Sequence, residues 1–252
     1  MEIFGLSWWI ITAVVFIAAV VRGAVGFAFA LFLSPFLLLF VTPKQVVVTD
    51  ITLSLASTLF NIFIMHRLFA NNIRIKIFIP IIIGLLVGMP FGAYVLDIIN
   101  IITFKIFIGI IIIVFAIALL FGVSFSFNKN FVTSGFVGIL GGFLATATSL
   151  GGPPVVLFLH GQQYSKEVIY CNQVIIWLFM FIFSLITLLI VNVINMQMIY
   201  ESVSFIPPLL LGMIVGMRTF LALNTVFFRN FTIIIIILSG LMAIISGIQD
   251  FH

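Results

Sequence analysis

Long stretches without a single charged residue divide this chain, and they constrain its fold more than any other feature. Charged residues make up 6% of the sequence, whereas soluble domains carry about 25%. A helix that crosses the hydrocarbon core of a bilayer needs roughly 20 apolar residues, and most of the stretches have about this length. They cover residues 3–21, 23–43, 77–96, 106–128, 130–165, 168–200, 202–217 and 230–249.

The lipid medium then decides the secondary structure. Within a bilayer each segment must satisfy its own backbone hydrogen bonds, and these stretches lack the polar–apolar alternation of barrel strands. We therefore predict an all-α polytopic membrane protein in the cell membrane, specifically the inner membrane of a bacterium or archaeon. Ten helical elements are expected, over residues 5–21, 26–41, 46–65, 77–96, 102–122, 131–148, 152–161, 168–191, 203–222 and 230–248.

The second half of the chain repeats features of the first. Residues 80–89 read Pro-Ile-Ile-Ile-Gly-Leu-Leu-Val-Gly-Met, and residues 208–217 repeat the Pro, both Gly and the final Met at the same spacing. Small residues at intervals of four often mark only close helix packing, but these lie at corresponding places in the two halves. We predict an N-terminal membrane repeat (1–126) and a C-terminal membrane repeat (127–252) within one integrated transmembrane domain.

Loop charges predict that the two repeats are inverted. Loop 66–76 carries three Lys or Arg residues, whereas the equivalent loop 192–201 carries none and ends in Glu201. Because basic loops tend to stay in the cytoplasm, the two loops are expected on opposite sides of the membrane. About five helical elements per repeat, or a re-entrant hairpin plus three crossings, would give this inversion. Lys44 and Lys105 fall on the wrong side in this arrangement.

Two glycine-bearing breaks, at residues 22–26 and 149–154, precede short apolar elements, and we expect broken or re-entrant helices at the midplane. In transporters with inverted repeats, the N-termini of such helices direct free N–H groups at an anionic substrate. The alternative is that Gly and Pro only kink packed helices. The candidate substrate-binding residues are Arg22, Gly23, Gly26, Phe27, Thr146, Thr148, Ser149, Gly151, Gly152 and Pro153.

Polar residues inside the apolar stretches are candidates for ion coupling. Asp50 lies within the third expected helix, Gln173 lies at the matching place in the eighth, and Asn172 is its neighbour. A carboxylate at the centre of a membrane helix costs about 2.5–3.5 kcal/mol on insertion scales, so it is a functional candidate. We predict proton coupling through Asp50. The alternative is that Asp50 lies shallow, near Lys44, and faces the lipid headgroups.

No catalytic constellation is visible. The histidines His66, His160 and His252 lie far apart, and none has metal-ligand spacing with Cys, Asp or Glu. The single Cys171 excludes a disulfide framework, and no basic run suits nucleic acid. We expect no enzyme activity, metal, cofactor or nucleic-acid partner. The expected partners are a small anionic substrate and the lipid bilayer. Assembly into a homo-oligomer is possible and is left undecided by the sequence.

The residues around both breaks resemble known signatures. Gly141-Gly142 followed by Thr-Ser-Leu-Gly-Gly-Pro-Pro-Val at 148–155 resembles the second glycine-rich signature of the sulfite exporter TauE/SafE family. Gly23-x-x-Gly26-Phe27 followed by Ser34-Pro35 looks like the first signature, and the resemblance covers nearly the whole chain. Residues 28–30, Ala-Phe-Ala, stand where the family usually has glycines. Their larger side chains are expected to leave less space in the N-terminal half of the anion site.

The resemblance implies a secondary transporter that exports or takes up a small sulfur-containing anion of the sulfite or organosulfonate class. Together with Asp50 it predicts coupling to the proton gradient. The alternative is an anion channel, or a permease for a different small anion.

Overall fold

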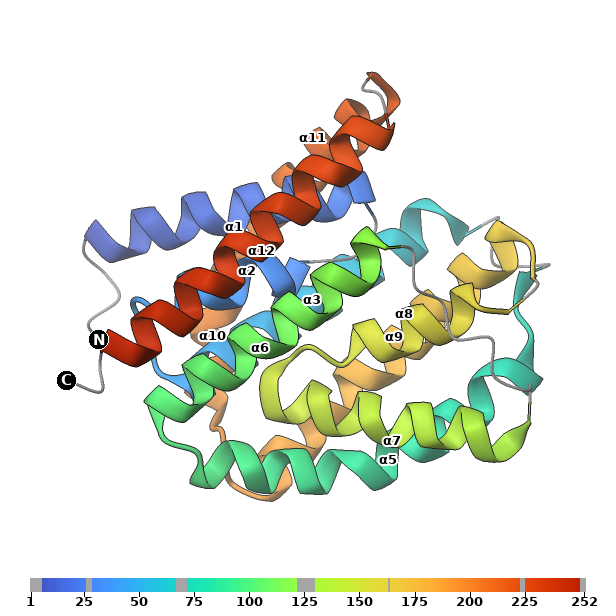
Figure 1. Ribbon diagram of the computed structural model, residues 1–252, viewed down its shortest axis with the longest axis horizontal. Coiled ribbons are helices and arrows are strands. Elements are labelled where there is room, and N and C mark those ends of the chain that lie inside the picture. The colour runs from blue at the N-terminus through green and yellow to red at the C-terminus, as the bar shows by residue number, and fades with distance from the viewer. Residues whose placement is uncertain are drawn as a thin grey trace. The chain divides into compact units, whose positions relative to one another are not determined.

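The computed structural model describes residues 6–25, 29–66, 72–121, 130–162, 164–222 and 225–249, and every regular element in these ranges is an α-helix (Figure 1). The all-α prediction is confirmed, and each of the ten expected elements overlaps one of the helices. The helices are α1 (Leu6–Val25), α2 (Phe29–Leu37), α3 (Pro43–Ile64), α5 (Ile75–Ile98), α6 (Ile101–Leu120), α7 (Phe131–Thr148), α8 (Gly152–His160), α9 (Lys166–Ile190), α10 (Met196–Val203), α11 (Ile206–Ala222) and α12 (Thr225–Gln249).

Several of the described helices are long and apolar enough to cross a membrane. Five pass by length and composition, and the count rises to six if the bent pair of α10 and α11 forms one span. Two shorter apolar helical segments, Trp8–Gly23 and Ile236–Gln249, accompany them. The prediction of a multi-pass membrane protein is therefore confirmed. The five spans are Pro43–Ile64, Phe78–Ile98, Ile101–Ala118, Phe131–Thr148 and Lys166–Ile190.

The helix α10 corrects the expectation that residues 192–201 form a loop. Residues 196–203 are helical, and the Ser202 hydroxyl donates a 2.8 Å hydrogen bond to the carbonyl oxygen of Met198. Helix α11 then leaves at an angle of 46°. Pro207 and Pro208 lie in its first turn, where their missing N–H groups cannot continue the hydrogen bonding of α10. The polar residues of this short segment made it look like a loop in the sequence.

The chain forms two compact units. The first contains Met1–Leu53, Ile99–Gly122 and Gln197–His252, and the second contains Ser54–Ile98 and Val123–Met196. Helix α3 contributes its residues 43–53 to the first unit and its residues 54–64 to the second. Each unit draws helices from both halves of the sequence, so a compact unit is not a sequence repeat. The repeat boundaries 1–126 and 127–252, and the inversion of the repeats, stay predictions.

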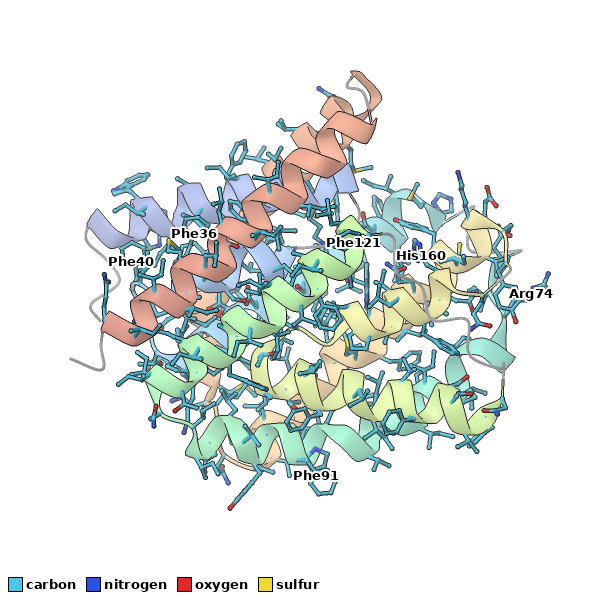
Figure 2. The ribbon with its side chains drawn as sticks, in the orientation of Figure 1. Phe36, Phe40, Arg74, Phe91, Phe121 and His160 are labelled. Atoms are coloured by element: carbon cyan, nitrogen blue, oxygen red, sulfur yellow. The ribbon has the colours of Figure 1, made fainter. Side chains whose placement is uncertain are left out.

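Within the second unit, α5 and α7 run side by side (Figure 1). A Cβ atom added at Gly84 or Gly88 would collide with backbone atoms of α7, at Gly135 and Ile139 respectively. These glycines therefore let the two backbones approach more closely than any other residue would. Phe91 of α5 is exposed and points away from the helix pair (Figure 2).

Within the first unit, the second copy of the Pro-Gly-Gly-Met motif has the same kind of neighbour. Helices α1 and α11 pack together, and a Cβ atom at Gly212 or Gly216 would collide with the backbone of α1 at Phe16 or Val20. Both motif copies thus press their glycines against the first helix of the opposite sequence half. The close-packing reading of the small residues is confirmed, and the repeat stays a prediction.

Lys105, one of the two residues on the wrong side of the predicted topology, is not a loop residue. It lies in α6, which runs beside α12 (Figure 1). The side chain of Lys105 is buried. The ammonium group donates a 2.9 Å hydrogen bond to the Ser246 hydroxyl near the C-terminus of α12. The positive-inside tendency concerns loop charges, so a buried, hydrogen-bonded lysine is a weak guide to topology.

Candidate functional site

The break between α7 and α8 is a tight reversal of the chain. Helix α7 ends at Thr148, and Ser149 caps it with a left-handed backbone (φ 64°) whose N–H donates to the carbonyl oxygen of Ala145 at 3.0 Å. Helix α8 packs back against α7 and is nine residues long. A helix of this length spans about 13 Å, far short of the roughly 30 Å hydrocarbon core, so α8 cannot cross a membrane.

The N-terminus of α8 presents two backbone amides. Pro153 and Pro154 follow Gly152 and have no N–H, so the donors at the start of this helix are those of Gly151 and Gly152. Among the described residues, neither amide donates a backbone hydrogen bond. Free N–H groups and the helix dipole together make such a terminus favourable for a negative charge.

The two glycines have different reasons to be glycine. A Cβ atom at Gly151 would collide with the carbonyl oxygen of Gly141, so packing alone excludes a side chain there. At Gly152 an added Cβ atom would approach only the indole of Trp177, at 3.4 Å from Nε1 and 3.9 Å from Cε2. Packing therefore explains Gly151, whereas at Gly152 the absent side chain chiefly uncovers the backbone.

The three hydroxyl groups near the break donate to backbone carbonyls. Thr146 Oγ1 donates to Met89 O of α5 at 2.8 Å, Thr148 Oγ1 donates to Leu144 O at 2.9 Å, and Ser149 Oγ donates to Thr148 O. An anion needs donors, and in this arrangement the hydrogen of each hydroxyl already serves the protein. The amides are thus better placed than the hydroxyls to bind an anion, and Thr146 also links α7 to α5.

Sequence analysis missed Trp177, which lies beside the α8 terminus. This residue is 3% exposed, and its indole N–H, a donor with no acceptor capacity, lies on the side of the ring nearest Gly152. It follows Gln173 by four residues on α9, so the two share a helix face. A tryptophan one turn from a buried amide was the signal available in the sequence.

The N-terminal break is described only in part. Gly26 and Phe27 lie outside the described residues, whereas Arg22 lies in the last turn of α1 and is 4% exposed. Its guanidinium carbon lies 5.9 Å from the ring centre of Phe29, the first residue of α2. At Gly23 a Cβ atom would collide with the carbonyl oxygen of Met213 in α11, so packing in the first unit requires this glycine.

Asp50 is fully buried in α3, which disagrees with the alternative that it faces lipid headgroups. The hydroxyl of Ser34, in the short helix α2, donates a hydrogen bond to Asp50 Oδ2. Next to Asp50, Thr49 shares a 3.0 Å hydrogen bond with Ser202 of α10. Residues 49 and 50 of α3 are therefore hydrogen-bonded to the short helix α2 and to α10 within the first unit.

Asn172 and Gln173 are both buried in α9, and the contacts of Asn172 are structural. Its Oδ1 accepts from the backbone N–H of Arg74 at 2.9 Å, and its Nδ2 donates to Asn72 O at 3.1 Å and Val168 O at 2.7 Å. The amide is thus occupied on both sides and holds the backbone of residues 72–74. The Arg74 side chain itself lies at the outer edge of the molecule (Figure 2).

The structure therefore brings one set of the predicted residues together. Residues of the α7–α8 break in the second unit are Thr146, Thr148, Ser149, Gly151, Gly152 and Pro153. Arg22, Gly23 and Asp50 belong to the first unit. In the part of the chain that is described, no three His, Cys, Asp or Glu side chains are grouped so that they could hold a metal ion.

Comparison with protein families gives one match over nearly the whole chain. The family described as sulfite exporter TauE/SafE matches residues 11–243, a range that contains both breaks and both copies of the Pro-Gly-Gly-Met motif. Searches among curated proteins and among solved structures give no match.

Proposed function

The chain belongs to the sulfite exporter TauE/SafE family, and from this membership we propose that it is a secondary transporter of a small sulfur-containing anion, sulfite or an organosulfonate. The family implies membrane transport of sulfite or a related anion, and the apolar helices agree with a multi-pass protein. We place it in the inner membrane of a bacterium or archaeon. There it exports or takes up the anion, and this transport is coupled to the proton gradient.

The anion site that we propose is the N-terminus of α8. The observation that carries this assignment is the pair of amides at Gly151 and Gly152, ahead of Pro153 and Pro154 and without backbone partners among the described residues. Two N–H groups at a helix terminus suit two oxygens of a sulfite or sulfonate group. The indole N–H of Trp177 is the third donor of this site. The hydroxyls of Thr148 and Ser149 join only if they exchange their carbonyl partners for the anion.

In the first unit, Arg22 is the residue of the predicted set that carries a positive charge. A buried guanidinium in a membrane protein is costly and is therefore a functional candidate. We assign it to attraction of the anion near the N-terminal break, to which Gly26 and Phe27 belong in sequence. Gly23 contributes the close packing of α1 on α11.

Asp50 is the residue that we assign to proton coupling. Its carboxylate lies in a membrane helix, is fully buried and accepts a hydrogen bond from Ser34. An ionisable residue inside a membrane helix is costly and is therefore a functional candidate. Binding and release of a proton at Asp50 would change its charge during the transport cycle, and the hydrogen bond from Ser34 would pass this change on to α2.

Substitutions at the two glycines test the anion site. Gly152→Ala and Gly152→Leu place side chains of increasing size over the amides where packing leaves room for a Cβ atom. We expect both proteins to fold, and we expect Gly152→Leu to lower [³⁵S]sulfite uptake into proteoliposomes by about tenfold or more, since about 1.4 kcal/mol of binding is tenfold. Gly151→Ala is the contrasting variant, because its Cβ atom collides with the backbone and should lower thermal stability first.

Normal uptake by a stably folded Gly152→Leu protein would discard the α8 site. The same proteoliposomes separate a transporter from the alternative of an anion channel. A transporter gives saturable uptake and counterflow, in which unlabelled sulfite inside accelerates the uptake of labelled sulfite. Uptake that rises in proportion to the gradient, without saturation or counterflow, would favour the channel.

A further inference from the structure

Helix α10 is held to the first unit by hydrogen bonds rather than by an apolar contact. Of its residues 197–203, which all belong to that unit, Ser202 is the one that is buried. The Ser202 hydroxyl shares a 3.0 Å hydrogen bond with Thr49 of α3, and the side-chain amide of Gln45 donates to the carbonyl oxygen of Met198 at 3.4 Å. Helices of soluble proteins dock through an apolar stripe, so the apolar side chains of α10 need another partner.

The exposed surface of α10 has an apolar side and a polar side. Tyr200 is 74% exposed and Val203 is 42% exposed, and their spacing of three places them on one side of the helix. On a different side, Gln197 Nε2 donates a 3.2 Å hydrogen bond to Glu201 Oε1 at the surface. A helix divided in this way suits the boundary between the headgroups and the acyl chains of a bilayer, where each side meets the medium that it matches.

Helices α1 and α11 of the same unit begin at the same end. Gly212 lies against Phe16 and Gly216 lies against Val20, so residue numbers rise together along the two helices. Helix α11 has 17 residues, which extend about 25 Å and reach the lower limit for a bilayer crossing. It can therefore cross without α10, whose axis differs from its own by 46°.

Exposed aromatic side chains lie at this end of the unit. The rings of Trp8, in the first turn of α1, and Phe205, directly before α11, have centres 6.1 Å apart. Trp9 beside Trp8 is 69% exposed, and the exposed Tyr200 precedes Phe205 by five residues. Trp and Tyr are enriched where a bilayer meets water, because their rings are apolar and carry one polar group. The junction of α10 and α11 thus has the residues typical of a membrane interface.

We propose that α10 lies in the membrane surface, parallel to the bilayer plane. Tyr200 and Val203 contact the acyl chains, and Gln197 and Glu201 lie among the headgroups. Lipid is thus the partner of the apolar side, and Thr49 of α3 is the partner of the buried side. The inference concerns lipid contact alone, so it stands or falls independently of the transported substrate. It makes the bilayer surface a second support for the helix that is hydrogen-bonded to α3.

Spin labels on single cysteines test this placement in the full-length protein in lipid bilayers. Cys171→Ala removes the cysteine of the chain, which is buried. Power saturation in electron paramagnetic resonance then measures how often each label collides with oxygen, which concentrates in lipid, and with a water-soluble nickel chelate. We expect the ratio of oxygen to nickel collisions to be at least about threefold higher on the apolar side than on the polar side. The positions replaced by cysteine, one at a time, are Gln197, Tyr200, Glu201 and Val203.

A label at Ile110, which is exposed near the middle of the α6 span, is the reference for the membrane interior. The four labels on α10 should lie shallower than this reference, and their depth should alternate with the side of the helix. A depth that increases steadily by about 9 Å from residue 197 to residue 203 would make α10 part of the α11 span and overturn the proposal. Nickel contact at all four positions would place α10 in water. Exclusion of both agents at Tyr200 and Val203 would place another protein there, and either result would also overturn it.

Two neighbouring substitutions test whether lipid holds the helix. Val203→Asp puts a carboxylate on the apolar side, whereas Ser204→Asp puts one at an exposed polar position. Val203→Asp should raise the nickel accessibility of a label at Tyr200 by about twofold or more, because the apolar side no longer favours the acyl chains. Ser204→Asp should leave that accessibility unchanged. Melting temperatures confirm that both variants are folded, and equal nickel accessibility in the two folded variants would contradict the lipid contact.

Discussion

Counted from their first residues, α3 and α9 bury the same five positions, but the side chains at these positions differ in polarity. They are Asp50, Ser54, Ser57, Thr58 and Asn61 in α3, and Gln173, Trp177, Met180, Phe181 and Ser184 in α9. The same 123-residue step that leads from Asp50 to Gln173 leads from Ser34, its hydrogen-bond donor, to the apolar Leu157. It also leads from Arg22 to Ala145. The fold thus sets which positions are buried, whereas the two halves of the chain divide the chemistry. Among the described residues, the buried charged side chains Arg22, Asp50 and Lys105 belong to the first half, and the uncovered amides of α8 belong to the second.

The largest expected effect comes from removing the charge of α3. Asp50→Asn keeps the shape and the hydrogen-bonding side chain beside Ser34 but cannot take up a proton. We expect sulfite uptake driven by a proton gradient to fall by about tenfold or more, because the gradient no longer drives transport when no proton binds at this site. Initial rates of uptake into proteoliposomes with and without an imposed gradient measure the effect.

Gln173→Leu is the matched variant for Asp50→Asn. It removes a polar group from the equivalent position of α9, where the proposed function needs no charge. Uptake with the gradient should stay within about twofold of the wild type if only α3 carries the proton. Unchanged proton-driven uptake in Asp50→Asn would reject coupling through this residue. Equal losses in both variants would instead show that the two helices share the task.

A stability effect of intermediate size is expected when α9 is given the chemistry of α3. Met180 is fully buried at the position of α9 that matches Ser57. Met180→Gln preserves the length of the side chain but buries an amide among apolar groups, which costs about 1–3 kcal/mol when no partner is available. The melting temperature of the purified protein in detergent should fall. An unchanged melting temperature would mean that water already reaches this face of α9, and the contrast with α3 would disappear.

Much of the architecture could be predicted because lipid leaves few choices. The charge-free stretches predicted most of the spans, although Pro43–Ile64 contains Lys44 and Asp50, and the Gly-Pro break predicted the short helix α8. The repeat of Pro, Gly, Gly and Met predicted close helix packing, and the structure confirms it. These features depend on single residue types with one dominant physical effect, such as the missing Cβ of Gly84 or the missing N–H of Pro153.

Features that depend on a partner distant in sequence could not be predicted. Helix α10 is too short and polar to stand out, yet Thr49 of α3 bonds to its Ser202. The side chain of Asn172 looked free for coupling, but it holds the backbone at Arg74, almost a hundred residues away. Likewise, sequence shows that Thr146 has a hydroxyl group and cannot show that Met89 already accepts its proton.

The smallest effect is expected at Ser184, and it bears most directly on why α9 is apolar. Its hydroxyl is fully buried and has no hydrogen-bond partner among the described residues. Removal of a buried hydroxyl without a partner is nearly neutral or slightly stabilising, by up to about 1 kcal/mol, because the folded state no longer carries a desolvated polar group. Ser184→Ala should therefore melt at or slightly above the wild-type temperature. A clear loss of stability would mean that the Ser184 hydroxyl has a partner such as bound water, and the α9 face would then resemble α3 more closely than its side chains indicate.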